Sequence, residues 1–168
     1  MPPPRLRRER PWQEHARLYR DLFADPAVAA ALWPREGQEQ AGERALDVLR
    51  RDIEHWQSHS FGPWVFFELA TGMFVGRGGL RRSVIAGGEC VEVLYALRPD
   101  AWGRGYATEI ALVSVQAARE LNIREVVGLA AVSNHASRRV LEKAGLLPRE
   151  PVEHAGLPHL FGRLRVLH

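Results

Sequence analysis

The sequence predicts a mixed α/β domain with one central sheet. Apolar residues fall at helical spacing up to about residue 60, and strand-like segments separated by glycine turns follow up to residue 98. Strand and helix patterns then alternate to the end of the chain. This order, an antiparallel meander followed by β-α-β-α-β, is a mixed α/β (α+β) arrangement. We expect a single domain over residues 1–168.

Three helices are expected in the first third of the chain. The first covers about 12–23, and the second starts at Pro26 with Asp25 as its N-cap. Pro34 is expected to end the second helix. Apolar residues at helical spacing predict a third helix over 39–57.

The middle of the chain is expected to form three strands. Segments 63–70 and 73–82 flank the dipeptide 71–72 (Thr-Gly), which predicts a hairpin. The glycine pair 87–88 predicts a second turn, and 89–98 is the third strand, which a proline ends. These segments make up the meander.

The last third alternates between helix and strand. A helix is expected from about Gly105 to Leu121, followed by the apolar, β-branched strand 124–132. The segment 134–144 is expected to be a helix that Gly145 closes, and 160–167 is expected to be the last strand.

The composition limits the classes of partner. Hydrophobic residues make up 46% and charged residues 26% of the chain, which is typical of a globular protein. No apolar run approaches the roughly 18 residues needed to span a membrane, and no secretory signal is recognised. The single cysteine, Cys90, fits a reducing compartment, so a cytoplasmic protein is expected. The net charge of +3 favours a small anionic ligand over nucleic acid, and we expect neither nucleic acid nor membrane as a partner.

The basic N-terminal segment, residues 1–10, allows three interpretations. Four arginines occur between positions 5 and 10. They suit a basic arm, a solvated edge strand or a frayed terminus.

The turn "WGRGYA" at 102–107 carries the strongest chemical signal. It joins a strand to a helix, whose first turn leaves about four backbone N–H groups without partners at the positive end of the helix dipole. Gly103 and Gly105 lack the Cβ that holds an anion away from the backbone, and Arg104 adds a positive charge. The turn therefore suits a phosphate or pyrophosphate. Judged by these residues alone, a glycine-rich turn without a ligand is nearly as good an interpretation.

Two motifs together resemble a known family. The stretch "RPDAWGRGYATE" at 98–109, followed by "NHASRRVLEKAG" at 134–145, is similar to the GCN5-related N-acetyltransferase (GNAT) superfamily, in particular its RimJ/RimL-type branch. The resemblance extends over roughly residues 5–167. It implies the GNAT-type acyl-CoA N-acyltransferase fold, with a V-shaped splay between two strands, and acetyl-CoA as cosubstrate with no metal.

The resemblance also implies where the cofactor binds. Main-chain N–H groups of the 102–107 turn would hold the pyrophosphate, and the preceding strand end would pair with the pantetheine amides. Trp102 stands where many members have Gln or Arg. Asn134 matches a residue that contacts the pantetheine arm, and it also suits a simple N-cap. The cofactor-binding residues so implied are Leu94, Tyr95, Ala96, Leu97, Trp102, Gly103, Arg104, Gly105, Tyr106, Ala107, Thr108, Asn134, Ser137 and Arg138.

Acetyl transfer to an amine requires a base for the ammonium proton and a proton for the leaving thiolate. Glu92 matches the family's acidic position and is the expected base, the alternative being a surface glutamate on an exposed strand. Glu68 and Glu89 are weaker alternatives. Ser137 is expected either to hydrogen-bond the thiolate or to pack under the cofactor. Leu141 stands where many relatives carry a tyrosine that acts as the general acid.

The expected function is therefore transfer of an acetyl group from acetyl-CoA to a primary amine, on a protein N-terminus or a small molecule. A non-catalytic CoA-sensing or protein-binding module on the same fold is the alternative. The spacing of His55 and His59 suits a metal, but no third ligand is evident, and none is expected. The chain is expected to be a monomer or a homodimer.

Overall fold

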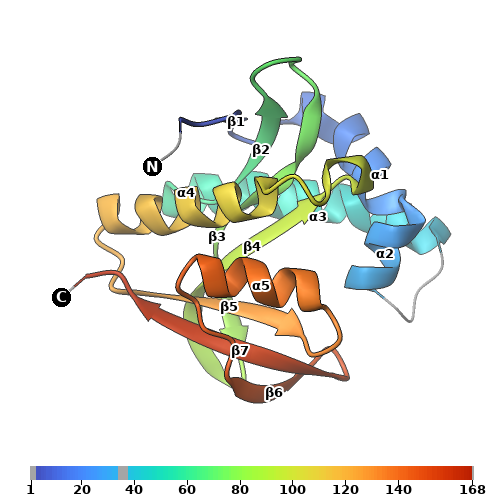
Figure 1. Cartoon of the computed structure of the whole chain (residues 1–168). Helices are drawn as coiled ribbons and strands as arrows, with labels where there is room; N and C mark the ends of the chain where they lie inside the picture. Colours follow the sequence, from blue (N-terminus) through green and yellow to red (C-terminus); the bar gives the residue numbers. More distant parts are fainter. Residues whose placement is uncertain (1–2, 34–37, 168) are drawn as a thin grey trace. The chain divides into compact units, whose positions relative to one another are not determined.

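The computed structural model describes residues 3–33 and 38–167 of the chain (Figure 1). Within these residues seven strands form one sheet in the order β1-β2-β3-β4-β5-β7-β6, with five α-helices. The mixed α/β fold class predicted from the sequence is thus confirmed. The elements are β1 (Leu6–Glu9), α1 (Ala16–Ala24), α2 (Pro26–Leu32), α3 (Gln38–His59), β2 (Pro63–Glu68), β3 (Phe74–Ile85), β4 (Gly88–Leu97), α4 (Tyr106–Glu120), β5 (Glu125–Ala131), α5 (His135–Lys143), β6 (Glu150–His154) and β7 (Leu157–Arg165).

The chain divides into two compact units. Unit 1 comprises residues 1–78 and 95–106, and unit 2 comprises residues 79–94 and 107–168. Strands β3 and β4 and helix α4 each begin in one unit and continue into the other. Each unit therefore contributes its own section of the sheet.

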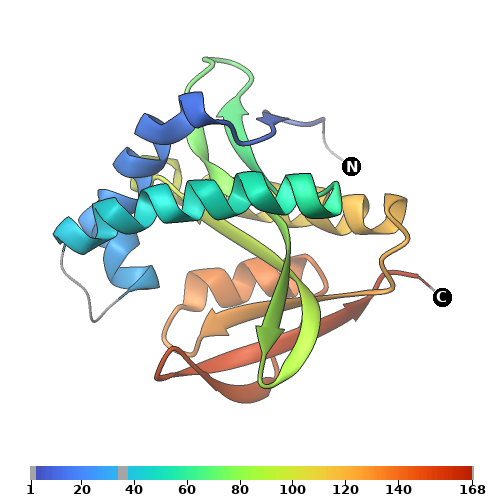
Figure 2. The same cartoon turned by 180° about the vertical axis from the view of Figure 1, so that it is seen from behind.

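Unit 1 contains the first three helices, which Figure 2 shows with the long helix α3 in front. Strand β1 pairs antiparallel with β2, with Leu6 opposite Glu68, so the N-terminal segment includes an edge strand. Helix α1 packs against α3. The core of this unit is aromatic and aliphatic, and its buried members are Tyr19, Leu22, Phe23, Val28, Ala45, Leu49, Val65, Phe67, Phe74 and Ala96.

A charged pair lies inside this core. The Arg77 guanidinium donates to both carboxylate oxygens of Asp52, at 2.9 and 2.8 Å, and the Tyr19 hydroxyl donates to the same carboxylate at 2.7 Å. All three side chains are buried. Burial alone would lower the pKa of Arg77, but the Asp52 carboxylate raises it, while burial and Asp52 raise the pKa of Tyr19 well above its ordinary value. The pair joins α3 to β3 within unit 1.

Unit 2 is built around β5, with α5 packed against it. Strand β5 pairs parallel with β4, where Glu92 lies opposite Val127, and antiparallel with β7. Two glycines allow close packing. A Cβ on Gly128 would lie 2.6 Å from Leu141 Cδ2, and one on Gly162 would lie 2.5 Å from the carbonyl oxygen of Leu146.

The expected helices are present. The first begins as a 3-10 turn, Gln13–His15, and continues as α1. Asp25 caps α2 as predicted, since its carboxylate accepts from Ala27 N at 2.9 Å. The expected stop at Pro34 lies outside the described residues. None of the described helices has the length and apolar character required to cross a membrane.

The strand predictions need two corrections. The turn between β3 and β4 is Ala86-Gly87, with φ of 50° and 77°, and not the Gly87-Gly88 pair, because Gly88 begins β4. Strand β6 was not predicted, and the last strand begins at Leu157 instead of 160. The β6–β7 turn is Ala155-Gly156, with φ of 52° and 75°. In both hairpins an alanine takes a left-handed conformation in which Gly, Asn or Asp is more usual, so the residue pattern misplaced the first turn by one residue and did not indicate the second.

Candidate cofactor-binding and catalytic residues

The turn that joins β4 to α4 has the backbone that its glycines suggest. Gly103 and Gly105 have φ of 72° and 81°, a left-handed region that residues with a side chain rarely adopt. Trp102 is half-exposed, and its indole Nε1 donates to the carbonyl oxygen of Leu97 at 2.9 Å. The indole thus fixes the start of the turn.

Two side chains at the end of this turn, those of Tyr106 and Arg104, bind Glu68 on the β2–β3 hairpin. The hydroxyl of buried Tyr106 donates to Glu68 Oε2 at 2.5 Å, and Arg104 Nη2 lies 2.9 Å from the same oxygen. Thr71 Oγ1 donates to Glu68 Oε1 at 3.0 Å. Glu68, named from the sequence only as a weaker candidate base, is therefore the centre of an ionic cluster.

The cluster sets the protonation of its members. Hydrogen bonds from Tyr106 and Thr71 hold the pKa of Glu68 below its ordinary value, and the hydrogen bond to Glu68 raises the pKa of Tyr106. A general base for an amine works best with a pKa near the operating pH. The shift on Glu68 runs in the opposite direction, which argues against it as the base.

Arg5 also contacts this turn, a contact that the sequence analysis missed. Its Nη1 donates to the main-chain oxygen of Arg104 at 2.8 Å, and its guanidinium carbon lies 4.5 Å from the centre of the Tyr106 ring. The guanidinium carbon of Arg104 lies 4.8 Å from the same ring. Arg5 and Arg104 are 99 positions apart, and no local pattern signals such a contact.

The strand end predicted to meet pantetheine runs close to β3. Ala96 and Leu97 are buried, while Leu94 and Tyr95 are half-buried. A Cβ on Gly76 would lie 2.8 Å from the Cα of Leu97, so only glycine allows β3 this close to the end of β4. The close approach fixes the path of β4 at its last residues.

The expected base, Glu92, is buried in unit 2. It is 8% exposed, so the alternative interpretation, a surface glutamate on an exposed strand, is wrong. Its Oε1 accepts from Arg81 Nη2 at 3.0 Å and from Ser83 Oγ at 3.2 Å. Glu89, the other weaker candidate, is exposed at the start of the same strand. The carboxylate of Glu92 is thus oriented by two neighbours.

Helix α5 carries the second motif. The side-chain oxygen of Asn134 accepts from Ser137 N at 3.1 Å, which confirms the N-cap interpretation. Ser137 is half-buried, and Arg138 Nη1 donates to the carbonyl oxygen of Val132 at 3.1 Å. Leu141, which aligns with the general-acid tyrosine of many relatives, is a core residue that packs on Gly128.

The remaining predicted residues take ordinary positions. Ala107 and Thr108 are half-buried in the first turn of α4. The rings of His55 and His59 lie 4.5 Å apart, and His55 Nδ1 is 2.7 Å from the carbonyl oxygen of Phe61. Across residues 3–33 and 38–167, no group of three or more metal-ligating side chains is placed to hold an ion.

This fold and the two motifs are those of a GNAT acetyltransferase domain. The family described as "Acetyltransferase (GNAT) domain" matches residues 5–147, and the chain belongs to that family. The family predicted from the two motifs is thus confirmed. A curated relative, the uncharacterized protein YkkB of Bacillus subtilis (strain 168), is 27% identical over 135 residues, which are 80% of this chain and 76% of the relative.

Solved structures share the fold over nearly the whole chain. An acetyltransferase from Agrobacterium tumefaciens str. C58 has a TM-score of 0.79 at 22% identity, covering 98% of this chain and 93% of that one. A ribosomal-protein-S5-alanine acetyltransferase from Vibrio fischeri has a TM-score of 0.71 at 13% identity, covering 98% and 95%. A spermidine N-acetyltransferase from Vibrio cholerae, in complex with CoA and spermine, has a TM-score of 0.70 at 14% identity, covering 96% and 95%.

Proposed function

We propose that this protein is an N-acetyltransferase of RimJ/RimL type that moves an acetyl group from acetyl-CoA directly to a primary amine. The observation that carries the proposal is the Trp102–Tyr106 turn. Both of its glycines take left-handed φ, and the turn leads into a helix at the place where the resemblance to the family puts the cofactor's diphosphate.

The residues of the turn fit a diphosphate. A Cβ on Gly103 would meet nothing within 4 Å, so the backbone there is open to a ligand. We assign the diphosphate to main-chain N–H groups of residues 103–107. On the strand, Leu94, Tyr95, Ala96 and Leu97 would pair with the pantetheine amides, and on α5 Asn134, Ser137 and Arg138 would complete the set by the family pattern. Acetyl-CoA, when bound, supplies the reactive thioester.

Proton transfer is assigned to two residues of unit 2. An alkylammonium has a pKa of about 10, so the acceptor amine must lose a proton before it attacks the thioester. We propose Glu92 as the base, directly or through water, because Arg81 and Ser83 fix the orientation of its carboxylate. Ser137 would donate a hydrogen bond to the departing thiolate.

The acceptor is a primary amine on a protein N-terminus or a small molecule. Solved structures of similar fold include both kinds of enzyme, one named for ribosomal protein S5 alanine and one for spermidine.

We place the reaction in the cytoplasm. Cys90 is the single cysteine, which suits a reducing compartment. Burial raises the pKa of its thiol, so Cys90 is a poor nucleophile.

A non-catalytic CoA-binding module is the second candidate. One observation favours it. Leu141 stands where many relatives have a tyrosine that acts as the general acid, and here it is a buried core residue packed against Gly128. Such a protein would bind CoA without transferring its acetyl group.

An acetyl-CoA activity screen over peptides with varied N-termini and a set of small amines separates the two candidates. We expect turnover with at least one amine, and a fall of roughly 10²–10⁴-fold for Glu92→Gln. Glu89→Gln is the matched control, because Glu89 is exposed on the same strand. CoA binding without turnover of any amine would favour the second candidate, and full activity of Glu92→Gln would remove Glu92 as the base.

A further inference from the structure

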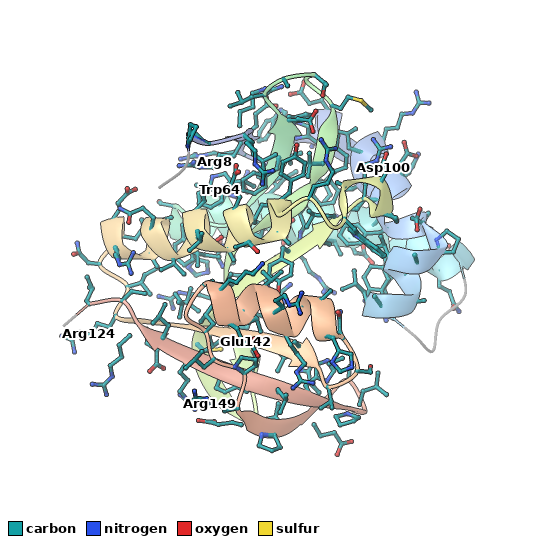
Figure 3. All side chains as sticks on the ribbon, in the orientation of Figure 1. Arg8, Trp64, Asp100, Arg124, Glu142 and Arg149 are labelled. Atoms are coloured by element: carbon teal, nitrogen blue, oxygen red, sulfur yellow. The ribbon has the colours of Figure 1, made fainter. Side chains whose placement is uncertain are left out.

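The N-terminal arginines form a regular set of contacts. Each of the four lies over an aromatic ring of unit 1, a geometry that stabilises a cation by its attraction to the ring face. Figure 3 labels one pair, Arg8 and Trp64. The distances from guanidinium carbon to ring centre are 4.5 Å for Arg5 on Tyr106, 4.3 Å for Arg7 on Phe67, 4.9 Å for Arg8 on Trp64 and 4.4 Å for Arg10 on Trp56.

Arg5 differs from the other three because its ring belongs to the β4–α4 turn. Its guanidinium also donates to the Arg104 carbonyl oxygen at 2.8 Å, and a Cβ on Gly105 would lie 3.2 Å from its Nη2. Three successive residues of the turn therefore face one side chain. The main chain of Arg5 is itself anchored, since its carbonyl oxygen accepts from Leu69 N at 2.9 Å.

We propose that Arg5 is a positioning residue for cofactor binding, which orients the turn so that its amides meet the diphosphate of CoA. This inference rests on the proposed function. The C=O of Arg104 and the N–H of Gly105 belong to one planar trans peptide and point in opposite directions. By holding that C=O, Arg5 fixes the direction of the Gly105 N–H. A hydrogen bond from a cation to the carbonyl also polarises the peptide, which makes its N–H a stronger donor.

The surrounding charges support this role. Glu68 binds the side chains of Arg104 and Tyr106, on either side of Gly105. Arg5 binds the peptide that joins Arg104 to Gly105, so two distant segments of the chain orient this turn. The groups around the turn include two guanidinium groups, those of Arg5 and Arg104, and one carboxylate, that of Glu68, which pairs with Arg104. The cluster therefore keeps a net positive charge beside the turn, which favours an anion.

The test compares two ligands in the full chain. CoA contains the diphosphate, and pantetheine lacks it but keeps the arm and the thiol. For Arg5→Ala we expect CoA binding, measured by isothermal titration calorimetry, to weaken roughly 10- to 100-fold, as for loss of a charged hydrogen bond. Pantetheine binding, followed by NMR titration, is expected to stay unchanged. The CoA affinity of Arg5→Lys, which keeps the charge and one donor nitrogen, is expected to lie between those of the wild type and Arg5→Ala.

Arg7→Ala is the matched control. Arg7 lies on β1, two positions after Arg5, and contacts Phe67 and Glu9 in place of the turn, so this variant is expected to bind both ligands as the wild type does. Equal weakening of CoA and pantetheine by Arg5→Ala would indicate a general structural defect and overturn the inference, as would unchanged CoA binding. Failure of the wild type to bind CoA would instead overturn the proposed function.

Discussion

The turns that precede α4 and α5 are stabilised in different ways. The turn before α5 is closed by Asn134, whose side chain accepts from the main chain only three residues ahead. The turn before α4 is held by Arg5, 99 residues from its hydrogen-bond acceptor, and by Glu68. A local cap needs little of the remaining fold. The α4 turn, by contrast, has its geometry only when β1 and the β2–β3 hairpin are in place.

The same contrast extends to the two units. In unit 1 a buried ion pair joins Asp52 on α3 to Arg77 on β3, and charged and aromatic groups meet across long stretches of sequence. Unit 2 relies on close backbone packing at Gly128 and Gly162 and on two short hairpins. Substitutions in the two units should therefore act by different mechanisms and with different magnitudes.

The largest effect is expected at the buried pair of unit 1. Asp52→Ala leaves the Arg77 guanidinium buried without its partner, so we expect a loss of about 3–5 kcal/mol in the free energy of unfolding. Urea denaturation measures it. Asp47→Ala on the same helix removes an exposed pair with Arg50 and should change stability by at most about 0.5 kcal/mol. Similar losses for the two variants would contradict the long-range account of unit 1.

In unit 2 we expect a smaller loss from crowding the backbone. Gly162→Ala places a Cβ 2.5 Å from the Leu146 carbonyl oxygen, and the main chain must shift, at a cost of about 1–3 kcal/mol. Gly88→Ala is the control, because its Cβ would be in ordinary contact with the Ile85 carbonyl oxygen, at 3.7 Å. Thermal unfolding compares the two, and equal melting temperatures would speak against close packing at Gly162.

The local cap is expected to contribute less again. Asn134→Ala removes the acceptor for Ser137 N and should cost about 1 kcal/mol, whereas Asn134→Asp should retain the cap. Urea denaturation of the pair separates the lost hydrogen bond from other effects of the substitution. A loss as large for Asp as for Ala would show that the cap is not what stabilises this turn.

The smallest effect is a pH dependence of the Glu68 cluster. Because the folded pKa of Glu68 is lowered, its contribution to stability is fully present above the ordinary glutamate pKa and is lost as the pH falls through the lowered value. The difference in melting temperature between the wild type and Glu68→Gln should therefore be constant near neutral pH and shrink in acid. A difference that grows on acidification would have the wrong sign.

The range of the interactions explains what the sequence predicted. The cap at Asp25, the cap at Asn134 and the glycines of the α4 turn act within a few residues, so a short window of sequence shows them. The contacts of Arg5 and the pair of Asp52 with Arg77 join distant segments, and no window contains both partners. Glu68 was named for its charge alone, and its role in the cluster follows only from the fold.

Strand β6 escaped prediction for a local reason. Its sequence, Glu150–His154, is mostly exposed and contains Pro151, which is tolerated on an edge strand but argues against a central one. The turn after it places Ala155 at φ 52°, where turn-forming sequences usually have Gly, Asn or Asp. Neither feature marks a hairpin until the pairing with β7 is seen.

The central claim is that the turn after Trp102 binds the diphosphate of CoA, and calorimetric titration of CoA tests it most directly. We predict that the wild type binds CoA with micromolar affinity and that Gly105→Ala binds it at least tenfold more weakly. The alanine would be strained at φ of +81°, and its Cβ would lie 3.2 Å from Arg5 Nη2. Gly72→Ala, at φ +74° in open space on the β2–β3 turn, carries the same backbone strain and should bind CoA normally. Absence of CoA binding by the wild type, or equal affinity in the two glycine variants, would contradict the account.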